Sequence, residues 1–145
     1  MPFSKGPVVI PMDFSKESAG AVRTAQQMTS DTSQLHLLHM LVPIDDMSPG
    51  VLFGQVTEEM RTEHVQRHLA ELAEECGVSE AKQVVLMGSP GPTIADYARD
   101  QEAELIIIPS HGYHGIKRLV LGSVAEGVIQ HAKCSVLVLR RSDAE

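Results

Sequence analysis

The residues best suited to chemistry lie between positions 105 and 131, where glycines follow a short apolar run. Gly112 and Gly115 stand in the loop after this run, and Gly122 precedes Ser123 at the start of a helical pattern. Glycine lets the backbone approach a ligand closely, and a helix start offers unpaired N–H groups and a positive dipole end. The combination predicts an anion site that holds a phosphate. Plain capping of the helix by Ser123 is the alternative, but a cap alone does not need the glycine loop.

Asp13 is the second candidate for ligand contact. It follows the first apolar run of the chain, residues 7–12. A carboxylate at the end of a strand can accept hydrogen bonds from two ribose hydroxyls, as acidic residues do in other doubly wound folds. Capping of the following helix is an equally good interpretation, and both roles can hold together.

The elements that would position these residues alternate between strands and helices. The predicted strands are apolar runs over residues 7–12, 34–40, 82–87, 105–108 and 136–139. The predicted helices, which carry apolar stripes, cover about 15–29, 56–76, 93–101 and 122–132. This order predicts one α/β domain over residues 1–145: a doubly wound, Rossmann-like sheet of five parallel strands with helices on both faces.

Such a sheet also predicts where a ligand binds. Ligands lie outside the carboxyl ends of the strands, where the strand order reverses. Asp13 follows the first strand and residues 109–115 follow the fourth, so we expect them to meet in one crevice. Residues 41–55 lack periodicity and predict a flexible loop that serves as a lid, an interface or a disordered segment. Residues 140–145 form a polar tail that is expected to fray.

Several spaced segments resemble the universal stress protein family. Its nucleotide-binding members carry the pattern G-x2-G-x9-G followed by Ser or Thr. Gly112, the nine residues after it and Gly122-Ser123 match the second half of that pattern. Further likeness lies in residues 8–13, 38–40, 88–90, 122–126 and 136–138. The resemblance implies an adenine nucleotide alpha hydrolase-like fold, a stress-response role and a homodimer formed through the last strand.

The resemblance also implies roles for individual residues. Asp13 and the backbone of Met40 would contact the adenine and the ribose. The glycine loop and the helix start would hold the phosphates through backbone N–H groups and the Ser123 hydroxyl. The complete set of predicted cofactor-binding residues is Pro11, Met12, Asp13, Met40, Gly88, Pro109, His111, Gly112, Gly122, Ser123 and Val124. Gly88 has a second interpretation as a simple turn residue.

Pro109 departs from the family pattern, because it stands where the first glycine is expected. Proline has no N–H group to donate. If position 109 donates to phosphate in binding members, the missing donor is worth about 1.5–3 kcal/mol, a roughly tenfold to hundredfold weakening. The donors at the helix start remain. We therefore expect a weakened site rather than an abolished one, unless Pro109 merely ends the strand.

Two hypotheses for function follow. The first is a regulatory protein that binds ATP or a related adenine nucleotide, with Mg²⁺ as an accompanying ion. The second is a homodimeric interaction module of the same fold that binds no nucleotide and recruits an unknown protein partner. Slow ATP hydrolysis ranks below both, because Asp13 is the only candidate base or Mg²⁺ ligand. The sequence contains neither a G-x-S-x-G elbow nor a Walker A motif.

The histidines do not predict a metal site. His111 and His114 lie in the glycine loop without further ligands nearby in the sequence. His36 and His39 alternate with leucines in the second strand, and we expect them to be buried or to line the crevice.

Composition narrows the partners and the compartment. A net charge of −7 and a pI near 5.4 argue against nonspecific binding to nucleic acid or to anionic membranes. No apolar segment approaches the ~20 residues of a membrane helix, and the N-terminus does not resemble a signal peptide. Cys76 and Cys134 are expected to be free, buried thiols in a reducing compartment. These features favour the cytoplasm. The apolar last strand would be an exposed sheet edge in a monomer, which favours the dimer.

Overall fold

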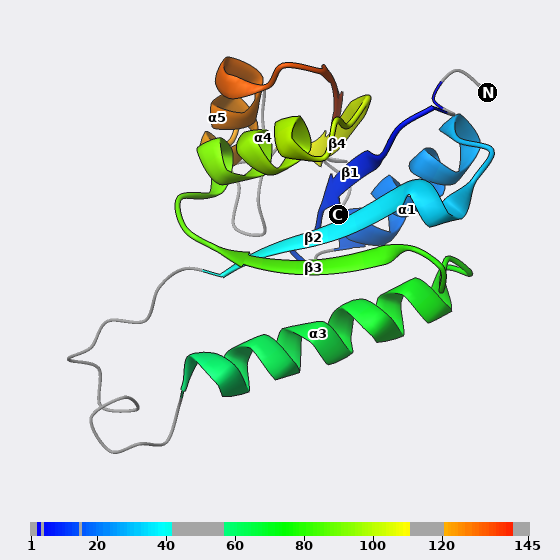
Figure 1. Ribbon diagram of the computed structural model, residues 1–145, viewed down its shortest axis with the longest axis vertical. Helices are drawn as coiled ribbons and strands as arrows, with labels where there is room; N and C mark the ends of the chain where they lie inside the picture. Colours follow the sequence, from blue (N-terminus) through cyan, green and yellow to red (C-terminus); the bar gives the residue numbers. More distant parts are fainter. Residues whose placement is uncertain (1–2, 4, 15, 42–56, 111–120, 141–145) are drawn as a thin grey trace.

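The computed structural model describes residues 3, 5–14, 16–41, 57–110 and 121–140, which form a parallel sheet with helices on both faces (Figure 1). The strand order is β3-β2-β1-β4-β5. The strands are β1 (Val8–Pro11), β2 (Leu35–Leu41), β3 (Lys82–Met87), β4 (Leu105–Pro109) and β5 (Ser135–Leu139). The helices are α1 (Lys16–Met28), α3 (Glu58–Glu75), α4 (Pro90–Asp100), α5 (Ser123–His131) and the 3₁₀ turn η1 (Thr32–Gln34). The predicted doubly wound fold is confirmed.

Strand β1 lies at the centre of the sheet, with two strands on each side. Val8, Val9 and Ile10 are completely buried. The strand pairs in parallel with β2 on one side and with β4 on the other, so that Val9 aligns with both His36 and Ile106. The chain first builds β2 and β3 on one side of β1 and then β4 and β5 on the other. The strand order therefore reverses at β1.

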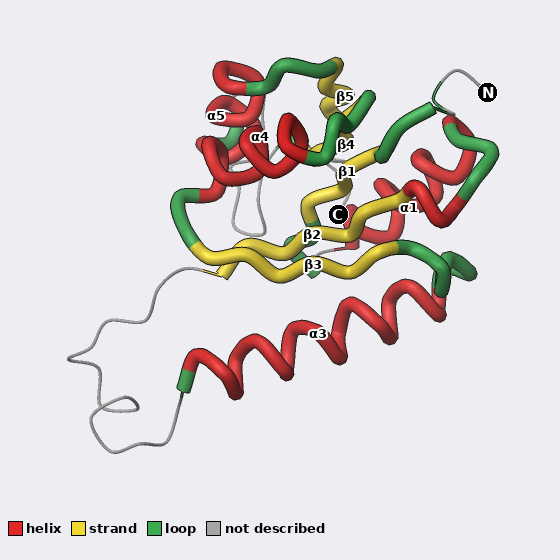
Figure 2. Tube along the Cα trace, in the orientation of Figure 1, coloured by secondary structure: helices red, strands yellow, loops and turns green. Residues whose placement is uncertain are grey.

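Alternate residues of the strands pack into two separate layers of helices. Val8 and Ile10 belong to the core beneath α1 and α3, whereas Val9 belongs to the core beneath α4 and α5. Figure 2 shows α3 running along the β2–β3 side of the sheet, with α4 and α5 together on the opposite side. Burial on both faces explains why the strands read as continuous apolar runs rather than as alternating ones.

Helices α4 and α5 approach each other through a pair of glycines. A Cβ atom added to Gly91 would lie 2.9 Å from the Cα of Gly127, and one added to Gly127 would lie 3.1 Å from the Cα of Gly91. No side chain fits at such distances without moving a backbone. The close contact fixes the first turn of α4 against α5, next to the ends of the central strands.

Some element boundaries differ from the prediction. Helix α4 begins at Pro90 rather than at residue 93, because a proline at the first helical position loses no intrahelical hydrogen bond. Helix α3 begins at Glu58, after Thr57, whose side chain caps it by accepting from the N–H of Met60 at 3.1 Å. Leu41 is a buried residue of β2, paired with Met87, and is not part of a loop.

The remaining predictions on loops and tails fall outside the described residues. These are the segment after Leu41, within 42–56, and the tail, within 141–145. Among the described helices, none is both long and apolar enough to cross a membrane. Both cysteines are free thiols, as predicted, but they are half-buried rather than buried.

Candidate functional site

A pocket of about 160 Å³ opens where the strand order reverses. Its walls come from the carboxyl ends of β1, β2 and β4 and from the N-terminal ends of α4 and α5. The lining residues are Pro11, Met12, Asp13, Leu38, His39, Met40, Pro90, Ile94, Ile108, Pro109, Val124 and Ala125. Most of them are apolar. A protein cavity of roughly 150 Å³ can hold benzene, so this pocket is large enough for a flat ring system.

Six of the predicted cofactor-binding residues line the pocket. The predicted residues that line it are Pro11, Met12, Asp13, Met40, Pro109 and Val124. Gly122 and Ser123 immediately precede Val124 at the start of α5, but they are not among the lining residues. His111 and Gly112 lie outside the described part of the chain. Segments that are distant in sequence, around residues 13, 109 and 124, thus meet in one crevice.

The turn from β1 into α1 holds Asp13 at the pocket. One carboxylate oxygen of Asp13, Oδ1, accepts a 3.0 Å hydrogen bond from the hydroxyl of Ser18 in the first turn of α1. The next residue, Phe14, has a φ of +62°. This left-handed conformation costs a bulky residue roughly 1–3 kcal/mol, so surrounding contacts must fix it. Asp13 is therefore bonded to the following helix and faces the pocket at the same time.

His39 supplies one of those contacts. Its ring stacks on the ring of Phe14, with centroids 4.8 Å apart. Its Nδ1 lies 2.6 Å from the carbonyl oxygen of Met12, and because a carbonyl only accepts, Nδ1 carries the proton. Burial lowers the pKa of His39, against the raising effects of the Met12 carbonyl and of Asp13. A neutral imidazole thus ties the end of β2 to the end of β1, and His39 lines the crevice as predicted.

His36 lies deeper in the sheet and belongs to a different set of contacts. It is buried, and its Nδ1 lies 2.7 Å from the hydroxyl of Tyr97 in α4. Burial is the main cause that lowers the pKa of His36, and the nearby charge of Lys82 adds to it. The prediction of a buried imidazole is confirmed, and His36 is not among the residues that line the pocket.

The start of α5 differs from the prediction in one respect. Gly122, not Ser123, is the N-cap, and no side chain caps this helix. The N–H of Gly122 donates to the carbonyl of Ser110 at 2.6 Å, and Ser110 in turn donates to the carbonyl of Leu139 in β5 at 2.8 Å. The Gly122 donor is therefore already used within the fold. The N–H groups of Ser123, Val124 and Ala125 have no acceptor within the helix, because the first turn provides none.

Pro109 ends β4 and lines the pocket. The neighbouring N–H, of Ser110, points to β5. Successive N–H groups of a strand point to opposite neighbours, so position 109 faces the β1 side, where pairing between β1 and β4 has ended at Ile106. An N–H group at position 109 would thus point toward the pocket. The proline ring occupies that place without a donor.

Gly88 has the turn role that was its second interpretation. It follows β3 with a φ of +142°, and a Cβ atom there would lie 2.9 Å from the hydroxyl oxygen of Thr93. Its N–H donates to the carbonyl of Leu41 at 3.4 Å. A conformation open mainly to glycine, together with the contact to Thr93, explains this residue without a ligand.

The sequence prediction missed several lining residues, which are Leu38, Pro90, Ile94, Ile108 and Ala125. Leu38 could have been found, because it shares a strand face with Met40. Pro90 was missed because the prediction began α4 at residue 93, whereas Ile94 lay inside the predicted helix but nothing in the sequence places that helix beside the pocket. Among the described lining residues none is Lys or Arg. Within the described ranges, no three His, Cys, Asp or Glu side chains gather to hold a metal ion.

Comparison with known families gives one match over most of the chain. The model of the universal stress protein family matches residues 6–140. Among curated proteins, universal stress protein A homolog 2 of Coxiella burnetii is 33% identical, over 82% of this chain and 83% of that protein. Universal stress protein MJ0531 of Methanocaldococcus jannaschii is 30% identical, over 95% of this chain and 84% of that protein.

Solved structures show the same fold. The hypothetical protein MJ0577 superposes with a TM-score of 0.77 at 26% identity, covering 94% of this chain and 97% of that one. A universal stress protein in complex with cAMP has a TM-score of 0.67 at 21% identity, covering 98% of this chain and 100% of that one. The universal stress protein of Archaeoglobus fulgidus in complex with dAMP has a TM-score of 0.62 at 21% identity, with coverages of 95% and 98%.

Proposed function

Because the chain belongs to the universal stress protein family, we propose that it binds an adenine nucleotide in the pocket at the ends of β1, β2 and β4. ATP or a related adenine nucleotide is the ligand, and Mg²⁺ enters only as the ion that accompanies its phosphates. The complexes of two structural neighbours with cAMP and dAMP support this ligand class. The output is binding rather than chemistry, in a stress-response regulator of the cytoplasm.

The apolar pocket is the observation that carries the proposal. Its volume of about 160 Å³ suits a purine ring, and Leu38, Ile94 and Ile108 supply an apolar wall. These residues are at most 2% exposed, so their positions are fixed by the core. A preformed apolar cleft with a few polar groups at its rim is the usual form of a small-molecule site.

Asp13 is the polar group proposed to bind the ribose. Asp13 lines the pocket, and its carboxylate is oriented by the bond from Ser18. A carboxylate at this place in a doubly wound fold can accept hydrogen bonds from two ribose hydroxyls. The first-turn N–H groups of α5, at Ser123 and Val124, would then receive the phosphate.

Titration calorimetry with the variant Asp13→Asn tests this arrangement. The asparagine oxygen can still accept the Ser18 hydrogen bond, so the change removes the charge and leaves the local fold in place. We expect the affinity for adenosine and for ATP to fall alike, roughly tenfold to hundredfold, because hydrogen bonds to a charged group are lost.

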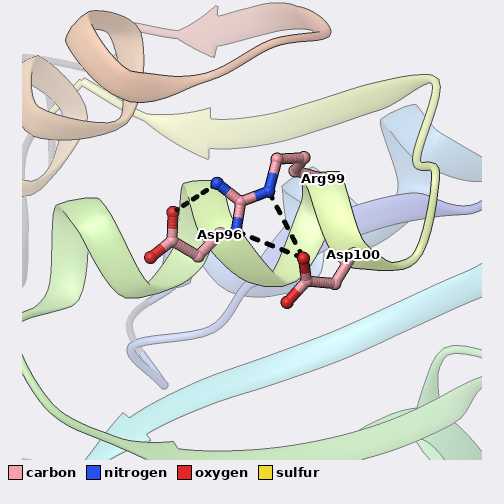
Figure 3. A network of polar contacts seen from close by, with 3 residues as sticks. All are labelled: Asp96, Arg99 and Asp100. Carbon is pink, nitrogen blue, oxygen red and sulfur yellow. Dashed lines mark hydrogen bonds and ion pairs between the residues drawn. The ribbon is translucent and has the colours of Figure 1, made fainter.

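Asp100→Asn provides a matched control at the opposite end of α4. Asp100 contacts Arg99 at 3.2 Å and its side chain is 65% exposed, and Arg99 also pairs with Asp96 at 3.3 Å (Figure 3). The substitution removes the same charge far from the pocket, so binding should not change. Equal affinities of the wild type and Asp13→Asn would show that the ribose does not lie at Asp13.

A nucleotide-free interaction module is the second candidate function. Two observations favour it: Pro109 lacks a donor, and the N–H of Gly122 is bonded to Ser110. Mass spectrometry of the small molecules released from protein purified without added nucleotide separates the two candidates. An adenine nucleotide in stoichiometric amount supports the first, and its absence together with no binding in calorimetry supports the second.

We also propose a homodimer formed through β5. This strand lies at the edge of the sheet and carries the half-buried apolar residues Val136, Leu137, Val138 and Leu139. A second copy would cover these side chains and the unpaired strand edge. Sedimentation velocity at micromolar concentration should show a dimer, and a monomer under these conditions would contradict the proposal.

A further inference from the structure

We infer that His64 and His68 form a binding site for a transition-metal ion on the exposed side of α3. The ion is a late first-row divalent cation, Cu²⁺, Ni²⁺ or Zn²⁺, because imidazole nitrogen suits these metals whereas Mg²⁺ prefers oxygen ligands. Neither histidine is among the residues that line the pocket, and α3 covers the side of the sheet opposite to α4 and α5 (Figure 2). The inference therefore does not depend on the proposed nucleotide function.

The spacing of the two histidines brings their rings together. They stand four residues apart within α3, so they lie about one turn apart on the same side of the helix. Their ring centroids are 4.4 Å apart, and the ring planes enclose an angle of 47°. With metal–nitrogen bonds of about 2.0–2.1 Å, two imidazoles on adjacent coordination positions have centroids roughly 4.5–5 Å apart. The two rings thus already have nearly the separation that a shared ion requires.

The surrounding fold holds this pair in place. Val65 and Leu69, which follow the two histidines in the sequence, are buried and anchor the helix in the core. The rings of Phe14 and His68 meet edge to face, with centroids 5.3 Å apart. Both histidines are nevertheless exposed, so an ion can reach them from solvent. A pair of ligands that is ordered before binding loses less conformational entropy when the ion binds.

The charge of α3 favours a cation. Arg61 and Arg67 act against it, but glutamates outnumber them in this helix, whose sequence is EEMRTEHVQRHLAELAEE. The protein as a whole has a net charge of −7. Within the described ranges, no group of three His, Cys, Asp or Glu ligands forms, so water completes the coordination shell. Among the three ions, Cu²⁺ should bind most tightly, as the general order of affinities for these metals requires.

Calorimetric titration of the untagged protein with Ni²⁺ and with Zn²⁺ tests the inference. We expect one tight site per chain, from which Mg²⁺ does not displace the ion. The variant His64→Gln leaves the contact between His68 and Phe14 in place but removes one ligand. Its affinity should fall at least about tenfold, because the second nitrogen no longer binds within the same molecule. Unchanged affinity in this variant, or no stoichiometric binding to the wild type, overturns the inference.

An exchange of two nearby residues is the matched control. The double substitution Gln66→His with His68→Gln keeps the number of histidines and uses exposed positions. Residues two apart on a helix do not face each other, so this pair cannot share an ion. Saturating Ni²⁺ should raise the Tm of the wild type, since only the folded helix holds the two rings together, and should raise that of the double variant by less. An equal rise in both shows adventitious binding only and overturns the inference.

Discussion

The two halves of the pocket are built from different kinds of group. The half that is proposed to hold the nucleoside, called the nucleoside half, is made of core side chains: Leu38, Ile94 and Ile108 belong to the buried cluster beneath α4 and α5 and also form the pocket wall. The half that is proposed to hold the phosphate, called the phosphate half, consists of backbone groups at the end of β4 and the start of α5. There Ser123 is exposed and Pro109 is only half buried.

Because of this difference, substitutions in the two halves of the pocket have different costs in stability. A change in the apolar wall removes buried contacts, and truncation of such a residue typically costs 2–5 kcal/mol of stability. A change at the helix start removes or adds one N–H group at little cost to the core. The phosphate preference of such a site can therefore change by one or two substitutions while the fold and the nucleoside half stay constant.

Pro109→Gly should have the largest effect on the difference between the two halves. The substitution introduces an N–H group on the β1 side of β4 that points toward the pocket, and so adds a hydrogen-bond donor to the phosphate half. We expect ATP affinity to rise roughly tenfold to hundredfold, the effect of one hydrogen bond to a charged partner. Isothermal titration against the wild type measures it.

Pro109→Ala is the matched control for this experiment. Alanine restores the same N–H but keeps a Cβ atom and a stiffer backbone. If both variants gain affinity, the donor is the cause. If only Pro109→Gly gains affinity, the close approach of the ligand to the backbone is the cause. An unchanged or lower affinity in both variants would mean that position 109 takes no part in phosphate binding and that Pro109 only ends the strand.

The fold could be predicted from sequence because its strands are buried on both faces. Runs such as residues 8–10 and 105–108 are apolar without alternation, which identifies a parallel sheet, and a parallel sheet predicts where its crevice lies. Asp13, Met40 and Val124 were found by this reasoning together with the family resemblance. Pro90 was not, because the prediction begins the helix at residue 93, and Ile94 was not, because its place beside the pocket depends on how α4 packs on the sheet.

The donor pattern could not be predicted from the sequence. Gly122 matches the family motif, but its N–H bonds to Ser110, a contact set by how the end of β4 meets the start of α5. Such a bond between two chain segments has no signature in residue type. For the same reason the stack of Phe14 on His39, which fixes the turn beside Asp13, is visible only in three dimensions.

The smallest expected effect is the pH dependence of stability that His39 causes in the nucleoside half of the pocket. Burial lowers its pKa in the folded state, below the ordinary value of about 6.5 in the unfolded chain. The charge of Asp13 acts against this shift, and those of Arg61 and His68 act with it. The unfolded state then binds a proton more readily, so the contribution of His39 to stability is present above pH ~6.5 and is lost as the pH falls through the folded pKa. His36 is shifted in the same direction and adds to the effect.

Urea unfolding of the wild type should therefore show a free energy of unfolding that decreases as the pH is lowered from about 7.5 to about 5. In His39→Asn the amide nitrogen can take the place of Nδ1 and donate to the Met12 carbonyl, yet it does not titrate. This variant should lose less stability over the same range, because the His39 part of the dependence is removed. Ser123→Pro lies in the phosphate half and should follow the wild-type slope. If the free energy of unfolding of His39→Asn has the same pH dependence as that of the wild type, then His39 does not cause that dependence.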